Sequence, residues 1–258
     1  AFLDAGGTFL DTAKVYADHS LFTADERSTN ELEQMFDFFV NTYKVPDYKY
    51  LIMSPVSMRK RLERMIQKET EAALKGRQGR IDIKLNNVAD FQMITLLENA
   101  ARAGVKVRML VRGSCAFAPL SGEEKPNLEI RSIVDKFLEH SRILIFHNEG
   151  EESVFLTSAD WMIRNLDSRV EMTFPIFDFS IRKELKDYFE IQWRDNEKSR
   201  VIDSNLANEY FRGEPAVPCR SQEEIYNYLR QRFEEKRRAL TADQIAAEPE
   251  RSTPASAN

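Results

Sequence analysis

Residues 131–165 read RSIVDKFLEHSRILIFHNEGEESVFLTSADWMIRN, and this stretch holds the most chemically specific side chains of the chain. His140 and Arg142 form an H-x-R pair directly before an apolar run, residues 143–146. An acidic turn separates this run from a second one, residues 154–156, which a polar S-A-D-W segment follows. This pattern predicts a β-hairpin. The hairpin would bring His140 and Arg142 close to the polar residues after its second strand.

The side chains of this hairpin suit phosphoryl chemistry. A titratable imidazole, a permanent cation and several hydrogen-bonding groups beside a sheet can position and stabilise a phosphoryl group. A lone histidine is also commonly a structural residue, with its hydrogen bonds satisfied at a helix end. The pattern alone leaves both interpretations of His140 open.

Length and composition allow one large domain or one and a half. The chain has 258 residues, of which 42% are hydrophobic, and its 37 cations and 42 anions give a net charge of −5. An acidic chain that binds a polyanion must cluster its cations. Cys115 and Cys219 are too few for a disulfide framework and fit a reducing cytosol. No apolar stretch approaches the ~20 residues of a membrane span.

Residues 80–111 predict a strand–helix–strand unit. Residues 80–85 alternate between apolar and polar side chains, a helix capped by Asn86, Asn87 and Asp90 follows, and residues 105–111 form the second strand. A crossover of this length implies a parallel pair of strands, and ligands bind at the carboxyl ends of such strands. That edge would carry Lys84, Asn86, Asn87 and Arg112.

Two amphipathic helices are expected near the ends of the chain. Ser28 and Glu31 fit a capping box for the first helix, and Ser221 and Glu224 fit one for the last, which would run through Arg238. Each helix carries an apolar stripe that we expect to pack in the core. The stripes are Leu32, Met35, Phe36, Phe39 and Val40 in the first helix, and Ile225, Tyr226, Leu229 and Phe233 in the last.

A cluster of cations lies at the start of a helix expected to follow Ser54 and Pro55. The cluster consists of Arg59, Lys60, Arg61 and Arg64. The helix dipole favours acids at this end, so the cations need another explanation. A bound phosphate chain would supply one, and a solvated basic face is the alternative.

The order of these motifs resembles bacterial polyphosphate kinases. RSIVDKFLEHSRI and TSADWMIRNLDSRVE resemble the C-terminal part of that family, and the K-L-N-N-x-x-D, V-R-G-x-C and T-A-x-x-Y-x-D motifs fit it in order and separation. The resemblance covers the chain from Thr12 to the last helix. Residues 4–8 read DAGGT where the family has a Gly-Thr-Gly-Asn order, which argues against a phosphate-cradling role for residues 1–11.

The resemblance implies an α/β fold of the phospholipase-D-like type, with a mixed or parallel sheet flanked by helices. Residues 1–49 would be the C-terminal remnant of a first phospholipase-D-like catalytic domain, and residues 50–240 the second such domain. Residues 241–258 contain too few apolar side chains to pack, and we expect a disordered tail.

The activity implied by the resemblance is the reversible transfer of the terminal phosphate of ATP to inorganic polyphosphate, with Mg²⁺ and a phosphohistidine. In the family the nucleophile belongs to an H-x-K motif in the first half, which we expect upstream of Ala1. The chain would then be part of a longer protein and inactive in isolation.

Specific roles for residues follow from the same resemblance. Arg112 would neutralise phosphate oxygens, His140 would face the transferred phosphoryl group as the catalytic residue, and Tyr16 would contact the nucleotide. Further phosphate contacts would come from Lys84, Arg142 and Arg164, and no residue is assigned to a metal. His19 and His147 fit no motif and are expected to be structural.

The implied partners are ATP, ADP and polyphosphate rather than nucleic acid. The implied protein is a cytoplasmic homo-oligomer, and peripheral association with a membrane stays open. Two other functions compete. A phospholipase-D-type phosphodiesterase would have lysine where this chain has Arg142. A module that binds polyphosphate or nucleotide without catalysis is the third interpretation.

Overall fold

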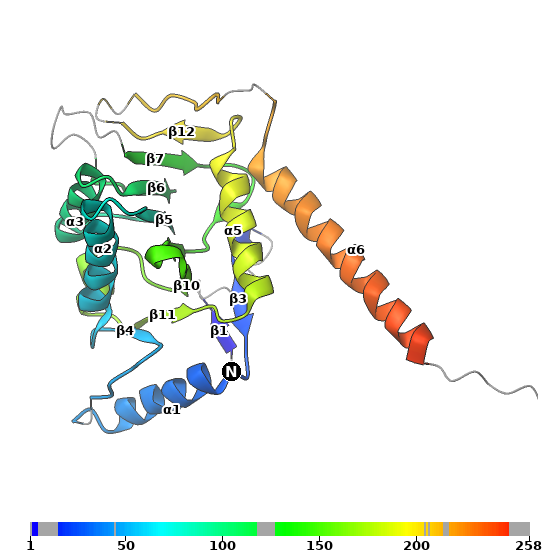
Figure 1. The fold of residues 1–258 in the computed structure, drawn as a ribbon, viewed down its shortest axis with the longest axis horizontal. Coiled ribbons are helices and arrows are strands. Elements are labelled where there is room, and N and C mark those ends of the chain that lie inside the picture. The colour runs from blue at the N-terminus through cyan, green and yellow to red at the C-terminus, as the bar shows by residue number, and fades with distance from the viewer. Residues whose placement is uncertain are drawn as a thin grey trace, which may run out of the picture.

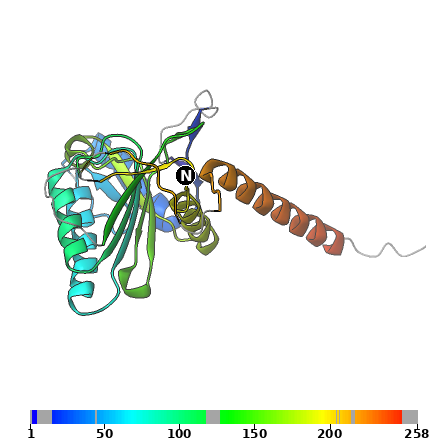
Figure 2. The same ribbon diagram turned by 90° about the horizontal axis from the view of Figure 1, so that it is seen from above.

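An eight-stranded mixed sheet forms the middle layer of the molecule, and helices cover both of its faces (Figure 1). The computed structural model describes residues 2–4, 15–43, 45–117, 127–203, 205, 207–213 and 217–247. Seen from above, α2 and α3 cover one face and α5 the other, while α6 projects away from the body (Figure 2). The α/β class with a mixed sheet, predicted from the sequence, is confirmed.

The strands of the sheet lie in the order β12-β7-β6-β5-β9-β10-β11-β4. Their bounds are β4 Ile52–Ser54, β5 Arg80–Leu85, β6 Lys106–Val111, β7 Leu128–Ile133, β9 Ile143–Phe146, β10 Ser153–Thr157, β11 Glu171–Pro175 and β12 Ser199–Val201. Two small sheets pair β1 Phe2–Asp4 with β3 Ser20–Phe22, and β2 Tyr16–Ala17 with β8 Leu138–Glu139. The helices are α1 Glu26–Val40, α2 Met58–Leu74, α3 Phe91–Arg102, α4 Ile163–Asp167, α5 Phe179–Trp193 and α6 Ser221–Ala247, with a 3-10 turn at Asn148–Gly150.

The two supersecondary units predicted from the sequence are present. Strands β5 and β6 are parallel and are joined through α3. Strands β9 and β10 form an antiparallel hairpin, in which Phe146 lies opposite Ser153 and Ile143 opposite Leu156. Strand β9 also pairs antiparallel with β5, so the hairpin is attached directly to the parallel unit.

Strand β9 and the middle of β10, residues 154–156, are entirely apolar because both faces of the sheet are buried. On β9, Leu144 and Phe146 point into the core beneath α2 and α3, whereas Ile143 and Ile145 point into the core beneath α5. Each such side chain contributes about 1.5–3 kcal/mol of hydrophobic free energy when fully buried.

The polar face of β5 is buried as well. Asp82 and Lys84 alternate with the apolar residues as predicted, yet both are almost fully buried, and their partners Arg108 and Glu139 bind Glu190 and Tyr188 of α5. Arg108 of β6 forms a bidentate pair with Asp82 and also binds Glu190 of α5. Ion pairs therefore fill part of the layer between the sheet and α5.

The predicted capping box of α1 is wrong. The helix begins at Glu26, and the Asp25 carboxylate caps it by accepting from the Arg27 N–H. Glu31 instead turns away from its own helix. Its carboxylate accepts the backbone N–H groups of residues 49, 50 and 51 at 2.6–3.0 Å. A buried acid thus ties α1 to the segment that leads into β4.

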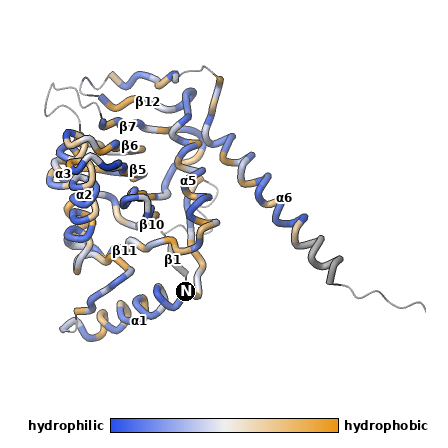
Figure 3. Tube along the Cα trace, in the orientation of Figure 1, coloured by the Kyte–Doolittle hydropathy of each residue, from blue (hydrophilic) through white to orange (hydrophobic). Residues whose placement is uncertain are grey.

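Much of both predicted apolar stripes lies on the surface. In α1, Met35 is buried but Phe36 and Val40 are 59% and 82% exposed. In α6, Ile225 is buried but Tyr226 and Phe233 are 65% and 66% exposed. Figure 3 shows the alternating hydropathy along the projecting helix. The expectation of core packing was wrong here because no described element covers the outer side of either helix.

One further expectation needs correction. Helix α6 continues past Arg238 to Ala247, so the first residues of the expected tail are helical, and residues 248–258 lie outside the described part. Strand β12, between α5 and α6, pairs antiparallel with β7 at the edge of the sheet. Among the described residues, no helix is long and apolar enough to cross a membrane.

Candidate functional site

The chain topology gathers the predicted polar residues at one edge of the sheet. The parallel strands β5 and β6 both end there, so Asn86 and Arg112 follow them at the same edge. Strand β9 is antiparallel to β5 and begins at this edge, with Ile143 opposite Lys84. Strand β10 ends there, which brings in the S-A-D-W segment.

Asp160 connects the loops of this edge. One of its carboxylate oxygens accepts the backbone N–H groups of Asn86 and Asn87 at 2.9 and 3.1 Å, and also the Arg142 Nε at 2.8 Å. The other accepts the Asn87 side-chain amide at 2.7 Å. Burial alone would raise the pKa of Asp160, but Arg142 and the Asn87 donors lower it below its ordinary value. An ionised Asp160 therefore fixes the loop after β5 against the start of β9.

Asp18 and Tyr16 fix the ring of His140. The His140 Nδ1 lies 2.7 Å from an Asp18 carboxylate oxygen, and the Tyr16 ring meets the imidazole edge-on at a centroid distance of 5.0 Å. The His140 backbone N–H donates to the Ala17 carbonyl, because β2 runs parallel to β8 just before it. With Asp18 ionised, Nδ1 carries the proton and Nε2 remains the reactive nitrogen.

Arg112 lies in the same hydrogen-bonded group as His140. Its Nε donates to the Asn86 side-chain oxygen at 3.2 Å, and the Asn86 amide donates to the His140 carbonyl at 3.2 Å. Burial lowers the pKa of Arg112, and the charge of Asp160 opposes this effect. Within the described residues, no carboxylate forms an ion pair with Arg112. A half-buried guanidinium bound by a neutral amide is suited to receive an anion.

Lys84 is enclosed beneath the site rather than open to it. Its Nζ lies 3.3 Å from Glu139, and both side chains are less than 5% exposed. Glu139 also accepts hydrogen bonds from three donors, the Tyr188 hydroxyl and the side-chain amides of Gln192 and Gln222. Burial lowers the pKa of Lys84, whereas the charge of Lys84 keeps the pKa of Glu139 low against the effect of burial.

His19 belongs to the same enclosed cluster. Its ring meets the Tyr188 ring edge-on at 4.6 Å. Burial, and then the charge of Lys84, lower the pKa of His19 to about 4. The imidazole is therefore neutral at physiological pH.

Comparison with known proteins gives the family. Residues 51–222 match the family described as polyphosphate kinase C-terminal domain 2. The chain belongs to the polyphosphate kinase family. Its relatives include the polyphosphate kinase of Vibrio vulnificus, 39% identical over 89% of this chain, and that of Klebsiella pneumoniae, 40% identical over 89%. The crystal structure of polyphosphate kinase from Porphyromonas gingivalis superimposes with a TM-score of 0.85 at 36% identity, over 91% of this chain.

The match covers only part of each relative. The chain spans about a third of the length of these polyphosphate kinases, 33% of the Vibrio vulnificus protein and 36% of the Porphyromonas gingivalis chain. The sequence resemblance to the C-terminal part of the family is thereby confirmed.

The remaining predicted site residues of this polyphosphate kinase chain differ in their accessibility. Arg142 is buried and held by Asp160, with its Nη1 also 3.4 Å from the His140 carbonyl. Arg164 is exposed on the short helix α4, and its guanidinium contacts the Met162 sulfur at 3.7 Å. The structure thus joins Tyr16, Arg112, His140 and Arg142 into one group, with Lys84 beneath it and Arg164 outside it.

The basic cluster at the start of α2 has a structural explanation. Arg59 forms bidentate pairs with Asp90 and Asp167. Arg61 donates to the backbone carbonyls of residues 48, 49 and 51. Both guanidiniums are occupied within the protein, so a bound phosphate chain is not needed to account for them. Lys60 and Arg64 remain as an exposed basic face.

The described residues contain no group of three or more His, Cys, Asp or Glu side chains that could hold a metal ion. Mg²⁺ usually binds through one or two carboxylates together with substrate phosphates, so it does not require such a group.

The sequence alone did not assign roles to several residues that build the site. Asp18 was part of a recognised motif without a role, and Glu139 and Asp160 were not identified as its supports. Asp160 could have been found, because an acid after a buried strand commonly caps neighbouring backbone N–H groups. Asp18 is 122 residues from His140, and nothing local indicates their contact.

Proposed function

We propose that the complete protein transfers the terminal phosphate of ATP reversibly to inorganic polyphosphate, and that this chain supplies one wall of the site. The proposal rests on membership of the polyphosphate kinase family and on one geometric observation. That observation is the Arg112 guanidinium, held by Asn86 beside His140 and, within the described residues, without an ion-pair partner. A fixed and unneutralised cation next to an oriented imidazole suits a transferred phosphoryl group.

Arg112 stabilises negative charge in this proposal. A guanidinium presents a planar fork of donors that matches phosphate oxygens, and partial burial strengthens its electrostatic effect. The neutral Asn86 partner orients the fork without competing for it as a carboxylate would.

His140 presents Nε2 to the phosphoryl group. As an imidazolium it donates a hydrogen bond or a proton to a phosphate oxygen, and as a neutral ring it accepts one. Asp18 acts as a positioning residue because it binds the opposite nitrogen. Tyr16, edge-on to the same ring, contacts the nucleotide in this proposal.

The other three cations act at greater range. Lys84 and Arg142 are already paired with Glu139 and Asp160, so we assign to them a fixed positive field and the support of the site. Arg164, which is exposed on α4, is assigned an outer phosphate contact.

The covalent phosphate belongs to a histidine outside this chain in our proposal. That histidine attacks the terminal phosphorus of ATP, a P–N bond forms and the P–O bond to ADP breaks. A terminal oxygen of polyphosphate then attacks the phosphohistidine, and the P–N bond breaks. Mg²⁺ accompanies ATP as a counter-ion of its phosphates, as is usual for this ion.

The domain division and the cellular setting are also proposals. We assign residues 1–49 to a preceding phospholipase-D-like domain, and residues 50–240 to the second. We further propose a cytoplasmic homo-oligomer with ATP, ADP and polyphosphate as partners.

Alanine substitutions of Arg112 and His140 in the complete protein test this function. Each should lower ATP-dependent polyphosphate synthesis by at least ~100-fold, the magnitude seen for loss of one charge-stabilising donor. Circular dichroism should stay unchanged. Tyr16→Ala should mainly raise the KM for ATP, with Tyr43→Ala, an exposed tyrosine of the α1–β4 connection, as the matched control. Near-normal synthesis by both Arg112→Ala and His140→Ala, or cleavage of bis-p-nitrophenyl phosphate by the unchanged protein, would contradict the proposal.

A further inference from the structure

A polar cavity lies at the edge of the sheet opposite to the edge that carries His140. Its volume is about 770 Å³, which is within the usual range of ligand pockets. It lies at the start of β5, where Arg80 stands, whereas the site described above lies at the end of β5. Five residue steps at about 3.3 Å per residue separate the two edges by roughly 17 Å. The cavity is therefore distinct from the site around His140.

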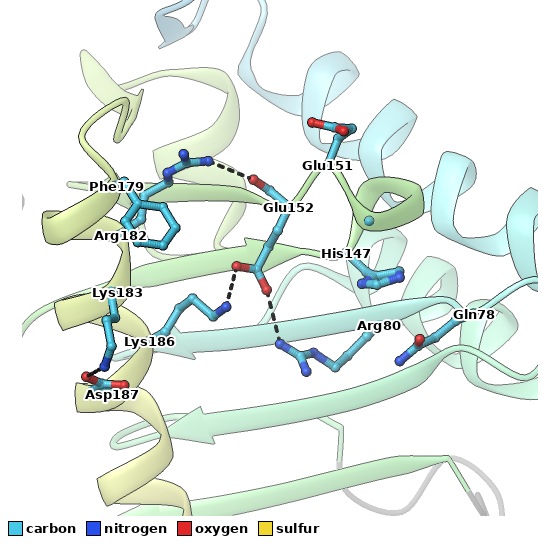
Figure 4. Close-up of a pocket in the computed structure, with 11 residues that line it drawn as sticks. Gln78, Arg80, His147, Glu151, Glu152, Phe179, Arg182, Lys183, Lys186 and Asp187 are labelled. Carbon is cyan, nitrogen blue, oxygen red and sulfur yellow. Dashed lines mark hydrogen bonds and ion pairs between the residues drawn. The ribbon is translucent and has the colours of Figure 1, made fainter.

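Cations from two elements converge on one carboxylate in this cavity (Figure 4). Glu152 accepts from Lys186 at 2.8 Å and from Arg80 at 3.3 Å, while its backbone carbonyl lies 3.4 Å from Arg182 Nη1. Arg80 comes from the start of β5, and Lys186 and Arg182 come from α5. Glu152 thus contacts three cations that arrive from two sides, and Arg80 is in addition paired with Asp82 at 3.0 Å.

The N–H groups of these cations outnumber the acceptors that the described residues offer them. Arg182 Nε is enclosed and has no hydrogen-bond partner within the described residues. A buried donor without a partner costs about 1–3 kcal/mol, and a bound ion, ligand or water would remove that cost. Lys186 has three N–H donors, of which Glu152 takes one. The other acids of the wall do not supply the difference, because Glu151 points away and Asp187 is engaged by Lys183 and Tyr228.

We propose that this cavity binds a phosphate-bearing anion. A phosphate offers three or more charged oxygens, so it can accept from Lys186, Arg182 and Arg80 together and adds to the acceptors that Glu152 and Asp82 supply. The volume admits a short phosphate chain rather than a single ion only. His147, whose ring lines the cavity beside Arg80, adds an imidazole that can hydrogen-bond to a phosphate oxygen (Figure 4).

The ring of His147 also gives a direct readout. Diethyl pyrocarbonate acylates accessible imidazoles, and peptide mass spectrometry reports each of the three histidines separately. Tripolyphosphate, the probe, should slow the acylation of His147 in the complete protein, and this protection should weaken as salt rises. ATP should protect as well, whereas adenosine should not, because recognition is by phosphate oxygens.

Two substitutions should move the affinity in opposite directions. Lys186→Gln should raise the concentration for half-protection by tripolyphosphate about tenfold or more, since it removes a charged donor. Glu152→Gln should lower that concentration, because the competing carboxylate is gone. General destabilisation cannot produce both results. Lys106→Gln is the matched control, as Lys106 starts the neighbouring strand opposite Arg80 but does not line the cavity.

Several outcomes would overturn the inference. These are no protection of His147 at millimolar tripolyphosphate, equal protection by adenosine and ATP, a shift in the same direction for Lys186→Gln and Glu152→Gln, or an equal effect of Lys106→Gln. His140 is followed in the same spectra, so protection of His140 without His147 would refute this cavity and leave the proposed function standing. Protection of His147 without protection of His140 would support this cavity and contradict the proposed function.

Discussion

The position of Asp18 decides which nitrogen of His140 can meet a substrate. A carboxylate at Nδ1 holds the ring in one tautomer and, in the proposed function, would support an imidazolium that forms during turnover. Tyr16 closes the side of the ring, so rotation about χ2 would cost both contacts. His140 is therefore oriented before any ligand arrives.

We predict that Asp18→Asn in the complete protein lowers kcat of polyphosphate synthesis by about 100-fold and changes the KM for ATP little. The amide keeps the size of the side chain but can present an N–H to Nδ1 and select the wrong tautomer, and general acid–base contributions are about 10²–10⁴-fold. The measurement is steady-state kinetics with a pH profile. Asp37→Asn, on the exposed side of α1, is the control. An unaltered kcat and pH profile would show that Asp18 has only a packing role.

His19 predicts a pH dependence of stability. Its pKa in the folded protein is about 4, below the ordinary 6.5, because burial and Lys84 oppose its protonation, while Asp18 and Glu139 act the other way. Between these values the unfolded chain binds the extra proton, so the free energy of unfolding falls as pH falls from 6.5 to 4. The loss amounts to about 3 kcal/mol at pH 4 and is absent above pH 6.5.

Urea unfolding of the protein and of His19→Gln at several pH values between 7 and 4 measures this effect. The variant has no imidazole to titrate at this position. Its free energy of unfolding should therefore fall less between pH 6.5 and 4, by the loss assigned to His19. Parallel plots of unfolding free energy against pH for the two proteins would mean that His19 is protonated equally in the folded and the unfolded state.

Local sequence patterns predicted the helices and strands well, but they predicted less well which faces of these elements are buried. Residues 80–85 and 143–146 were placed correctly because alternation and unbroken apolar runs are local properties. Phe36 and Phe233 show the opposite case. Their spacing is that of a buried stripe. Burial also requires a second element that packs on the stripe, and the sequence of the helix itself does not show whether such an element exists.

The same distinction applies to the candidate site. The topological rule for parallel strands correctly gathered Asn86, Asn87 and Arg112 at one edge. It could not show that Lys84 would be enclosed, because the enclosing groups come from α5 and α6 through Tyr188, Gln192 and Gln222. The spacing of residues in the sequence thus indicates which side chains lie at an edge of the sheet. Whether these side chains are accessible depends on helices that are distant in sequence.

Helix α6 should divide into an attached and a projecting part. Ile225 is buried, Tyr228 binds Asp187 and Arg232 pairs with Glu184, which fixes the first turns to α5. We predict that truncation after residue 235 leaves the melting temperature within ~2 °C. Truncation after residue 220 should lower it by roughly 4–8 °C, because Ile225 loses its burial and Glu139 loses the Gln222 donor. Differential scanning calorimetry measures both, and equal losses would show that the projecting part is packed.

On the scale of the whole molecule, one row of charged side chains connects the two edges of the sheet. Arg80, Asp82 and Lys84 share the α5 side of β5, and each has an ion-pair partner. Buried pairs of this kind add little to stability compared with apolar packing, and losing one partner is costly. The row therefore fixes the geometry of the cavity at one edge and of the His140 site at the other more than it stabilises the fold.

The division of labour within the complete protein gives the last prediction. Our proposal assigns the covalent phosphate to a histidine outside these 258 residues and gives His140 a role at Nε2 that needs no P–N bond. The isolated chain should then bind polyphosphate in a salt-sensitive manner, through Arg112 and the exposed cations, but should retain no acid-labile phosphate after incubation with γ-labelled ATP. The control is the isolated His140→Gln chain, which should give the same blank result. Stoichiometric acid-labile label that disappears in this variant would make His140 the nucleophile, because an Asp18-oriented imidazole would then carry the phosphate itself.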